Sequence, residues 1–476
     1  MRTETLLIGD RHITTADRDP FAVACPATLT PVAMVPTATE QDAYDALETA
    51  SAAFNQWRQA TASQRSNLLL KIAARLDEKA DMLGRLMTEE QGKPLAEAIG
   101  EAEFIGEEFR FAAAEAERLN GEILPAPALD VDRFVRTEPA GVVVALPSSN
   151  YPAAIAARKI SALLAAGCAG VIRAPEEAPS AAIFIVKTCL EAGLPAGVLN
   201  VLSGNPAGVT EALITDPRSA MVSFTGSNRV GQIVLGHAAQ TITPALVELG
   251  GTAPLIVGKD TDIGHVAPMM VNKKHENAGQ NCAAPNYALV HRDIYDAFAE
   301  AYWAAAQSIR VGNGRDADVT MGPLVSAAGA TAMRQRVDAL RQAGATLHQA
   351  DAGLPSEGHF VAPTLATDVP STSSLLHEEV FAPLMPMVAF DDIEEAVAIA
   401  NKSPFGLAAY AFTGSQWEAH FIARELSVGS LALNKTGVGD IDAPFGGYGQ
   451  SGFGTEGGRY GIDAFLRRKF VSMRYV

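Results

Sequence analysis

The sequence predicts an α/β fold in which helices cover both faces of parallel β-sheets. Between Val142 and Thr225, short apolar strands alternate with helical segments, and repeated units of this spacing are typical of a parallel sheet. A second α/β stretch begins near Leu249 and runs to about Leu433. A chain of 476 residues exceeds one ordinary hydrophobic core, so we expect two or three domains.

The first part of the chain is predicted to be helical. From Thr39 to Gln91, apolar residues recur every three or four positions, and Gly92 and Pro94 end the run. A further helix is expected over residues 96–119. Residues 133–145 predict a pair of strands, because they alternate and then become continuously apolar. The strands and helices that follow are expected at residues 142–146, 153–166, 169–173, 180–192, 198–202, 207–215 and 221–225.

The chain ends in a strand-like segment, KFVSMRYV, within residues 459–476. This strand is rich in Val, Phe and Tyr and has no partner nearby in the sequence. Its edge would be exposed unless another subunit covers it.

Composition excludes several function classes. The net charge of −17 and the absence of a basic run argue against nucleic-acid binding, because phosphate contacts require clustered Lys and Arg. Apolar stretches are interrupted well short of ~20 residues, so no membrane span is expected, and the N-terminus lacks the pattern of a secretory signal. The four cysteines show no zinc-like spacing. We therefore expect reduced thiols, no metal site and a cytoplasmic protein.

Four short segments carry residues suited to chemistry. The segment AGQNCAAPNY places Cys282 among small and amide-bearing residues, where a thiol with an ordinary pKa of about 8.5 needs help to act as a nucleophile. The segment LVELGGTAP places Glu248 at the end of an apolar strand, where a carboxylate with a raised pKa can act as a general base. Taken alone, such a Cys is more often a buried small side chain than a nucleophile, and Glu248 is equally compatible with a capping residue.

The other two segments lie where a strand gives way to a helix. In PSSNYPAA, the Asn150 amide can donate to a developing oxyanion, although a lone Asn is more often a turn residue. In SFTGSNRVGQ, Gly226 and Ser227 would present backbone N–H groups at a helix N-terminus, which suits a pyrophosphate. Taken by itself, that segment is better explained as a plain strand–helix turn.

Together, in this order and at these separations, the four segments resemble the aldehyde dehydrogenase superfamily. The resemblance covers nearly the whole chain. It extends to GLPAGVLNVLSG from Gly193, HEEVFAPL from His377, SPFGLAAYAFT from Ser403 and APFGGYGQSGFGTEGG from Ala443. The combination is far more specific than any one segment.

The resemblance implies roles for the reacting residues. Cys282 would attack an aldehyde carbon to form a thiohemiacetal, and Asn150 and the Cys282 N–H would stabilise the oxyanion. After hydride transfer to a nicotinamide, Glu248 would activate the water that hydrolyses the thioester. Lys159 and Glu456 match positions that assist proton movement in relatives. Since Cys282, Glu248 and Asn150 are all present, catalysis is expected.

The resemblance also implies a dinucleotide cofactor. Glu176 would bond ribose hydroxyls and repel a 2′-phosphate, which favours NAD, whereas Arg173 could accept that phosphate, so NADP is the alternative. The chain departs from the usual family motifs at residues 148–152, 173–176 and 378–383, where an indole and a lysine are missing. The positions that match cofactor-binding residues are Arg173, Glu176, Gly226, Ser227, Glu379 and Phe381.

Within the superfamily, the C-terminal region is most similar to succinate-semialdehyde dehydrogenases. Arg158 matches one of their anchors for a substrate carboxylate. A second anchoring arginine is Glu276 here, and a serine anchor aligns with Gly439. The resemblance therefore implies an aldehyde substrate, with a semialdehyde such as succinate semialdehyde as the leading example.

The family fold would divide the chain into three parts. A Rossmann-type dinucleotide-binding domain would comprise residues 1–119 and 138–247, and an α/β catalytic domain residues 248–456. A small β oligomerisation arm would combine residues 120–137 and 457–476, which implies a homodimer or homotetramer. Two alternatives are a CoA-acylating semialdehyde dehydrogenase, against which Glu248 argues, and a non-catalytic structural member like the lens crystallins of this fold.

Overall fold

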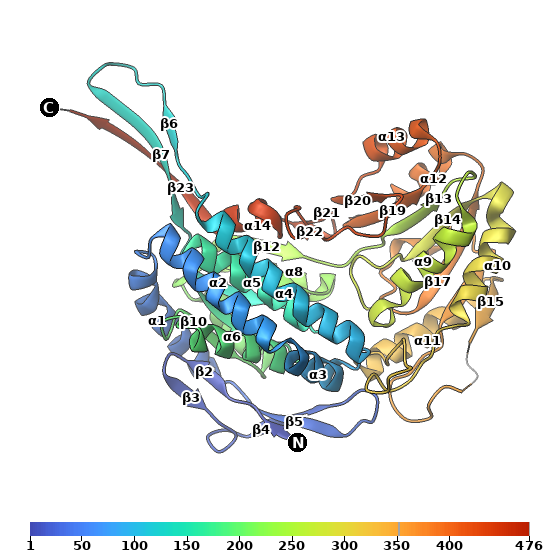
Figure 1. Ribbon diagram of the computed structural model, residues 1–476, viewed down its shortest axis with the longest axis horizontal. Helices are drawn as coiled ribbons and strands as arrows, with labels where there is room; N and C mark the ends of the chain where they lie inside the picture. The colour runs from blue at the N-terminus through green and yellow to red at the C-terminus, as the bar shows by residue number, and fades with distance from the viewer. Residues whose placement is uncertain (351–352, 476) are drawn as a thin grey trace.

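The computed structural model describes residues 1–350 and 353–475. Two large sheets lie in separate halves of the molecule, and a slender β arm projects from the body (Figure 1). Helices α1 to α8 belong to the half that holds the first sheet, and α9 to α13 to the other half. The predicted α/β fold is confirmed.

The first sheet has the strand order β22-β12-β11-β8-β9-β10-β2-β3. Its central strands pair in parallel, and every residue of β8 is buried. A strand covered on both faces needs such a continuous apolar sequence, here VVVAL. The strands are β2 (Leu6–Ile8), β3 (Arg11–Ile13), β8 (Val142–Leu146), β9 (Ala169–Arg173), β10 (Leu199–Leu202), β11 (Ser219–Thr225), β12 (Ala245–Glu248) and β22 (Gly452–Phe453).

Helices pack on both faces of this sheet, and their limits follow from capping residues. Thr39 and Thr61 each form a capping box, and Gly92 and Gly167 end helices in the left-handed conformation. The helical region predicted over residues 39–91 thus consists of three helices. The helices are α1 (Glu40–Trp57), α2 (Ala62–Glu78), α3 (Ala80–Gln91), α4 (Leu95–Ala116), α5 (Pro152–Ala166), α6 (Ser180–Glu191), α7 (Pro206–Thr215) and α8 (Asn228–Thr241).

The second sheet has the order β15-β16-β17-β14-β13-β19-β20 and is parallel except at β15. Its strands are β13 (Pro254–Val257), β14 (Tyr287–His291), β15 (Thr346–Gln349), β16 (Thr364–Thr367), β17 (Leu384–Phe390), β19 (Ala408–Phe412) and β20 (Ser430–Leu433). The helices of this half are α9 (Ile263–His275), η1 (Glu276–Gly279), η2 (Arg292–Ile294), α10 (Tyr295–Ala306), α11 (Ala327–Gln342), η3 (Ser374–His377), α12 (Ile393–Ala400) and α13 (Gln416–Glu425).

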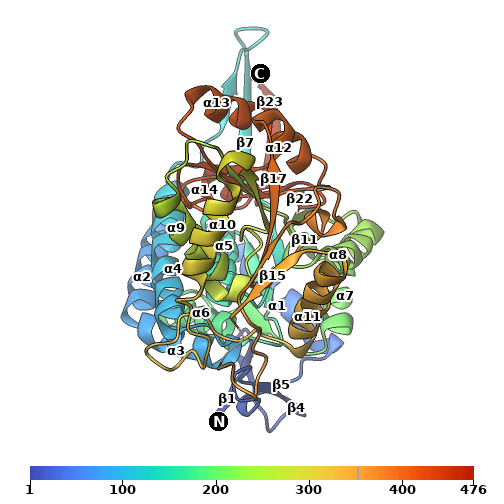
Figure 2. The same cartoon turned by 90° about the vertical axis from the view of Figure 1, so that its right-hand side faces the viewer.

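The projecting arm is the antiparallel sheet β23-β7-β6. It combines β6 (Glu122–Leu124), β7 (Val131–Pro139) and the C-terminal strand β23 (Leu466–Arg474), and Figure 2 shows it standing clear of the body. The predicted terminal strand therefore has an intrachain partner in β7. Its other edge has no partner within the described residues, and Phe470 is 54% exposed.

The remaining elements are small. Strands β1 (Arg2–Thr3), β4 (Pro20–Ala24) and β5 (Pro31–Pro36) form a sheet of their own, and β18 (Phe405–Gly406) pairs with β21 (Tyr448–Gly449). Helix α14 (Gly458–Asp463) precedes β23. No helix in residues 1–350 and 353–475 is long and apolar enough to cross a lipid bilayer.

Candidate active site

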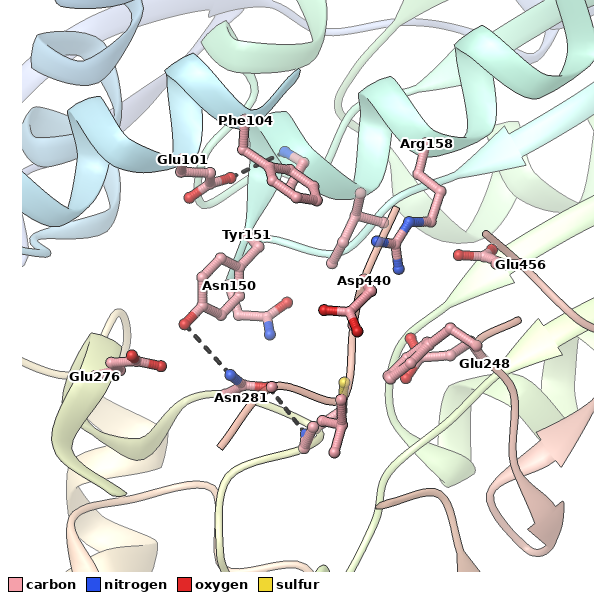
Figure 3. A pocket seen from close by; sticks show the side chains of 18 of the residues that line it. Glu101, Phe104, Asn150, Tyr151, Arg158, Glu248, Glu276, Asn281, Asp440 and Glu456 are labelled. Carbon is pink, nitrogen blue, oxygen red and sulfur yellow. Dashed lines mark hydrogen bonds between the residues drawn. The ribbon is translucent and has the colours of Figure 1, made fainter. Parts of the chain in front are cut away.

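Two cavities meet at Cys282. One, of about 480 Å³, is shown in Figure 3, and the other, of about 610 Å³, runs along the carboxyl ends of β8, β9, β11 and β12. Both are lined by Asn150, Glu248 and Cys282. The three residues that sequence patterns mark as reactive therefore lie at the junction of two cavities.

A tight turn positions Cys282 between η1 and β14. Asn277 and Ala278 have φ angles of 49° and 54°, and Gly279 continues the left-handed backbone with 74°. A Cβ at Gly279 would lie 2.5 Å from the carbonyl oxygen of Ala382, so only glycine fits there. The left-handed conformation costs Ala278 about 1 to 2 kcal/mol. The Asn281 side chain then accepts from the Ala283 N–H at 2.9 Å and holds the turn that carries the thiol.

Asn150 lies in the loop between β8 and α5, as predicted. Its Oδ1 accepts a hydrogen bond from the Ser148 hydroxyl at 2.7 Å, and its Nδ2 donates to the Gln280 carbonyl at 3.1 Å. These contacts fix the orientation of the amide. The second hydrogen of Nδ2 forms no hydrogen bond with the described residues.

Glu248 is the last residue of β12, as predicted, and is only 4% exposed. Burial and, to a smaller extent, the nearby Glu456 carboxylate raise the pKa of its carboxyl to about 7, against the opposing effects of Cys282 and Lys159. Its Oε1 has no hydrogen-bond partner among the described residues. Burial and the neighbouring Glu248 carboxylate also raise the pKa of the Cys282 thiol, so the thiol needs a proton acceptor to react.

Lys159 and Glu456 form an ion pair behind Glu248. Lys159 is 1% exposed and Glu456 7% exposed. Lys159 also donates to the Ser223 hydroxyl at 2.9 Å. The structure thus brings both predicted proton-handling residues together.

The larger cavity has the features of a dinucleotide site. It is lined by all six residues predicted to bind the cofactor. The Thr225 hydroxyl and the Arg173 Nε are buried in its wall with no partner in the described part of the chain. Such orphaned polar groups fit a polar ligand, and carboxylates at Glu176 and Glu379 fit ribose hydroxyls. The residues present therefore fit NAD or NADP.

Two details of this cavity differ from the sequence prediction. The Gly226 N–H donates to the Glu248 carbonyl at 3.1 Å, so this amide is not free for a pyrophosphate, and Ser227 at the start of α8 is left to offer one. Arg173 forms an ion pair with Glu176. Glu176 therefore partly neutralises the positive charge by which Arg173 would attract a 2′-phosphate.

The three predicted substrate residues line the smaller cavity. Arg158 lies on α5 and donates to Glu108 from Nε at 3.1 Å. Glu276 forms an ion pair with Lys273 at 2.8 Å, and Gly439 lies in the loop after β20. Figure 3 shows Arg158 and Glu276 on different sides of the pocket.

Several site residues could not be found from sequence patterns. Lys93, Glu101 and Glu108 come from the α3–α4 region and reach the site only through helix packing. Asn277 donates to the Asn150 carbonyl at 2.8 Å. Of these four residues, Asn277 alone lies close to Cys282 in the sequence, and this closeness could have marked it as a site residue. No group of three or more His, Cys, Asp or Glu side chains in the described ranges is placed to hold a metal ion.

Comparison with known proteins agrees with this geometry. The model of the aldehyde dehydrogenase family matches residues 12–471. A 4-(hydroxymethyl)benzenesulfonate dehydrogenase of Comamonas testosteroni is 40% identical over 100% of this chain and 98% of its own length. The mitochondrial succinate-semialdehyde dehydrogenase of Homo sapiens is 36% identical over 99% of this chain and 88% of its own.

Solved structures match over the same extent. The succinate-semialdehyde dehydrogenase of Burkholderia pseudomallei has a TM-score of 0.96 at 34% identity and covers 99% of this chain and 98% of its own. The betaine aldehyde dehydrogenase of Staphylococcus aureus, in complex with NAD+, has a TM-score of 0.95 at 30% identity, covering 98% and 94%. An NADP-dependent enzyme of E. coli has a TM-score of 0.95 at 33% identity, covering 100% and 98%.

Proposed function

This chain belongs to the aldehyde dehydrogenase family and is an NAD(P)-dependent aldehyde dehydrogenase, and from that premise we propose that it oxidises an aldehyde to a carboxylate through a thioester on Cys282. The observation that carries the proposal is the junction of two cavities at Asn150, Glu248 and Cys282. The smaller cavity would admit the aldehyde and the larger one the dinucleotide.

The first step is attack of sulfur on the carbonyl carbon. Because burial raises the pKa of the Cys282 thiol, the thiol needs a base to become a nucleophile, and Glu248, whose pKa is about 7, would accept its proton as the C–S bond forms. The new C–S bond leaves a negative charge on the former carbonyl oxygen. The Nδ2 of Asn150 and the Cys282 N–H would stabilise this charge.

Bound NAD(P) supplies the acceptor for the hydride that leaves the tetrahedral carbon. The resulting thioester must then react with water. Glu248 would take a proton from that water, and hydrolysis releases the carboxylate and restores the thiol. The buried Lys159–Glu456 pair lies where it would help protons leave Glu248 for solvent.

For the cofactor, we propose NAD ahead of NADP. Glu176 lines the larger cavity and carries the negative charge that opposes a 2′-phosphate. Its ion pair with Arg173 holds that arginine away from the role of a free phosphate-binding cation.

The semialdehyde substrate remains a prediction. Arg158 supports it, since its guanidinium lines the pocket. Its pairing with Glu108 weighs against it, because a guanidinium already bound to a carboxylate attracts a second one less strongly.

We also propose that the arm pairs between subunits in a homodimer or homotetramer. The unpaired edge of β23 and its exposed apolar side chains, Phe470 and Met473, support this assignment. Within the proposed three-part division of the chain, β22 lies in the catalytic segment but pairs with β12 of the first sheet, and Ile462 and Phe465 of the arm segment are buried in the core around that sheet.

The test is an oxidation assay with acidic, aromatic and neutral aldehydes, each with NAD and with NADP. We expect NAD(P)H formation without CoA, loss of activity in Cys282→Ser, and retention of activity in Cys25→Ser, since Cys25 lines neither cavity. Activity that requires CoA would instead identify a CoA-acylating enzyme. Full activity of Cys282→Ser would exclude the proposed thioester.

A further inference from the structure

The charges that line the smaller cavity are unequally partnered. Its two cations, Arg158 and Lys273, each lie in an ion pair, and its carboxylates outnumber them. Among these carboxylates, Glu276 pairs with Lys273 and Asp440 with Lys435, whereas Glu97 forms no ion pair among the described residues. We propose that this pocket selects an aldehyde whose tail carries an ammonium group, an inference that rests on the proposed function of Cys282.

Arg158 is held by carboxylates of the protein itself. Its Nε and one terminal nitrogen lie 3.1 and 3.0 Å from the same oxygen of Glu108, with both side chains largely buried. Burial works to lower the pKa of Arg158, but Glu108, Glu456 and Glu248 together raise it above its ordinary value. The positive charge of the guanidinium is thus balanced by carboxylates of the protein and is less available to bind an anionic substrate.

Lys273 is similarly engaged. Its ammonium lies 2.8 Å from Glu276, which is the more exposed partner at 43% against 18%. A ligand entering the pocket therefore meets the carboxylate more readily than the ammonium. Figure 3 shows the Glu276 carboxylate on the Tyr151 side of the cavity.

Glu97 has no cation within 4 Å in residues 1–350 and 353–475. Its Oε2 accepts the Asn277 N–H at 2.9 Å, whereas Oε1 accepts no hydrogen bond from the described residues. Burial, together with the Glu276 and Glu101 carboxylates, raises the pKa of its carboxyl to about 7, against the opposing effects of the Asn277 N–H and the more distant Lys93 ammonium. A positive group beside Glu97 would relieve that repulsion, whereas a negative group would increase it.

Aromatic rings complete the wall. Phe104, Tyr151 and Phe445 line the same cavity. Lys93 lies 4.0 Å from the centre of the Tyr151 ring, and Arg158 lies 5.6 Å from that of Phe445. Phe104 has no such cationic partner among the described residues and, as Figure 3 shows, its ring faces the pocket. Carboxylates together with an open aromatic face recognise quaternary ammonium groups well.

A matched series of aldehydes tests the inference. Butanal, succinate semialdehyde and 4-(trimethylammonio)butanal share a four-carbon chain and differ in the charge of the tail. We expect kcat/KM to fall from the cationic to the neutral to the anionic aldehyde. One charge at about 6 Å and an effective dielectric constant of about 40 is worth roughly tenfold, so steps of about tenfold are expected.

Variants locate the effect. Glu276→Gln and Glu97→Gln should each lower the ratio of kcat/KM for the cationic over the neutral aldehyde by about tenfold. Glu276→Arg should raise kcat/KM for succinate semialdehyde relative to butanal. The control is Glu103→Gln, which removes the same charge from the exposed face of α4 outside the pocket and should leave all three values unchanged.

A binding assay separates this inference from the proposed function. The alcohol 4-(trimethylammonio)butan-1-ol should protect Cys282 from iodoacetamide at lower concentration than 4-hydroxybutanoate does, whether or not any aldehyde is oxidised. Failure of every aldehyde to turn over would refute the proposed function. The protection assay would then still show whether the pocket prefers a cationic to an anionic ligand. A preference for succinate semialdehyde or for 4-hydroxybutanoate, unchanged by Glu276→Gln, would overturn the inference.

Discussion

Lys93 and Glu101 form a buried ion pair, with 2.6 Å between Nζ and Oε2 and side chains only 1% and 3% exposed. Lys93 also donates to the Asn150 carbonyl at 3.0 Å. The other oxygen of Glu101 accepts the N–H groups of Ala153 and Ala154, each at 3.0 Å, and so caps α5. The pair therefore holds the carbonyl of the proposed oxyanion donor and the first turn of α5 that follows it.

We predict that Lys93→Met lowers both stability and kcat. Loss of the ammonium leaves the Glu101 carboxylate buried without a partner, which costs about 3 to 5 kcal/mol. Displacement of Asn150 should lower kcat by on the order of 10 to 100-fold with a smaller change in KM. Denaturant unfolding and steady-state kinetics measure the two effects.

The double variant Lys93→Met/Glu101→Gln distinguishes positioning from stability alone. A glutamine can still accept both α5 amides without a buried charge, so stability should largely return while kcat stays low. Recovery of kcat together with stability would show that the pair does not position Asn150. The matched control is Arg85→Met, which removes an exposed ion pair with Asp81 and should change little.

The pH dependence of turnover should follow Glu248. Its carboxyl has a pKa raised to about 7 by burial and by Glu456, and only the ionised form can accept a proton. The rate of thioester hydrolysis should therefore rise as pH increases toward 7 and level off above it. Glu456→Gln removes a charge that raises this pKa, so the inflection should move to lower pH. Rate–pH profiles of the wild type and of Glu456→Gln give the two inflection points. An inflection that does not move in Glu456→Gln would show that the observed pKa does not belong to Glu248.

Asn150→Ala should lower kcat by about 10² to 10³-fold, the usual effect of removing one oxyanion donor. The Nδ2 group that would stabilise the transition state is lost, whereas the thiol and its base remain. Iodoacetamide labelling of Cys282 should be reduced far less than kcat. Ser148→Ala, which removes only the hydroxyl that orients Asn150, should have a smaller effect. An equal loss in the two variants would argue against direct contact of Asn150 with the oxyanion.

Glu176→Gln should shift cofactor preference toward NADP. The substitution removes the charge that opposes a 2′-phosphate and releases Arg173 from its ion pair. Since both changes favour the phosphate, the ratio of dissociation constants for NADP and NAD should fall by about tenfold or more. Fluorescence titration with each dinucleotide measures it. An unchanged ratio would show that the adenine ribose does not lie beside Glu176.

The central strands were predictable because their chemistry is local. A short, fully apolar run rich in β-branched residues, such as Val142–Leu146, is best accommodated as a buried strand. Asn150 lies in the loop that follows this strand, so its position follows from that of the strand. The short strands near the N-terminus were not predicted. β2 and β3 have three residues each, and β2 joins the sheet by pairing with β10, nearly two hundred positions away. So short a segment is defined by its partner rather than by its own pattern.

The site divides in the same way. Cys282 and Glu248 lie in segments whose own residues create the turn or the strand end that presents them. Glu101 lies in the middle of α4 and is indistinguishable by pattern from its exposed neighbours, until α4 packs against α5. The partner of Arg158 is Glu108, fifty positions earlier, so its use as a substrate anchor could not be judged from sequence.

The most direct test of the account is the mass of the enzyme during turnover. Glu248→Gln, mixed with an aldehyde and NAD, should form one equivalent of NADH in a burst and then stall, because the thioester lacks its base. Mass spectrometry should find the acyl group of the aldehyde on the peptide that contains Cys282. A burst without an adduct at Cys282, or steady turnover at the wild-type rate, would contradict the thioester and the role of Glu248.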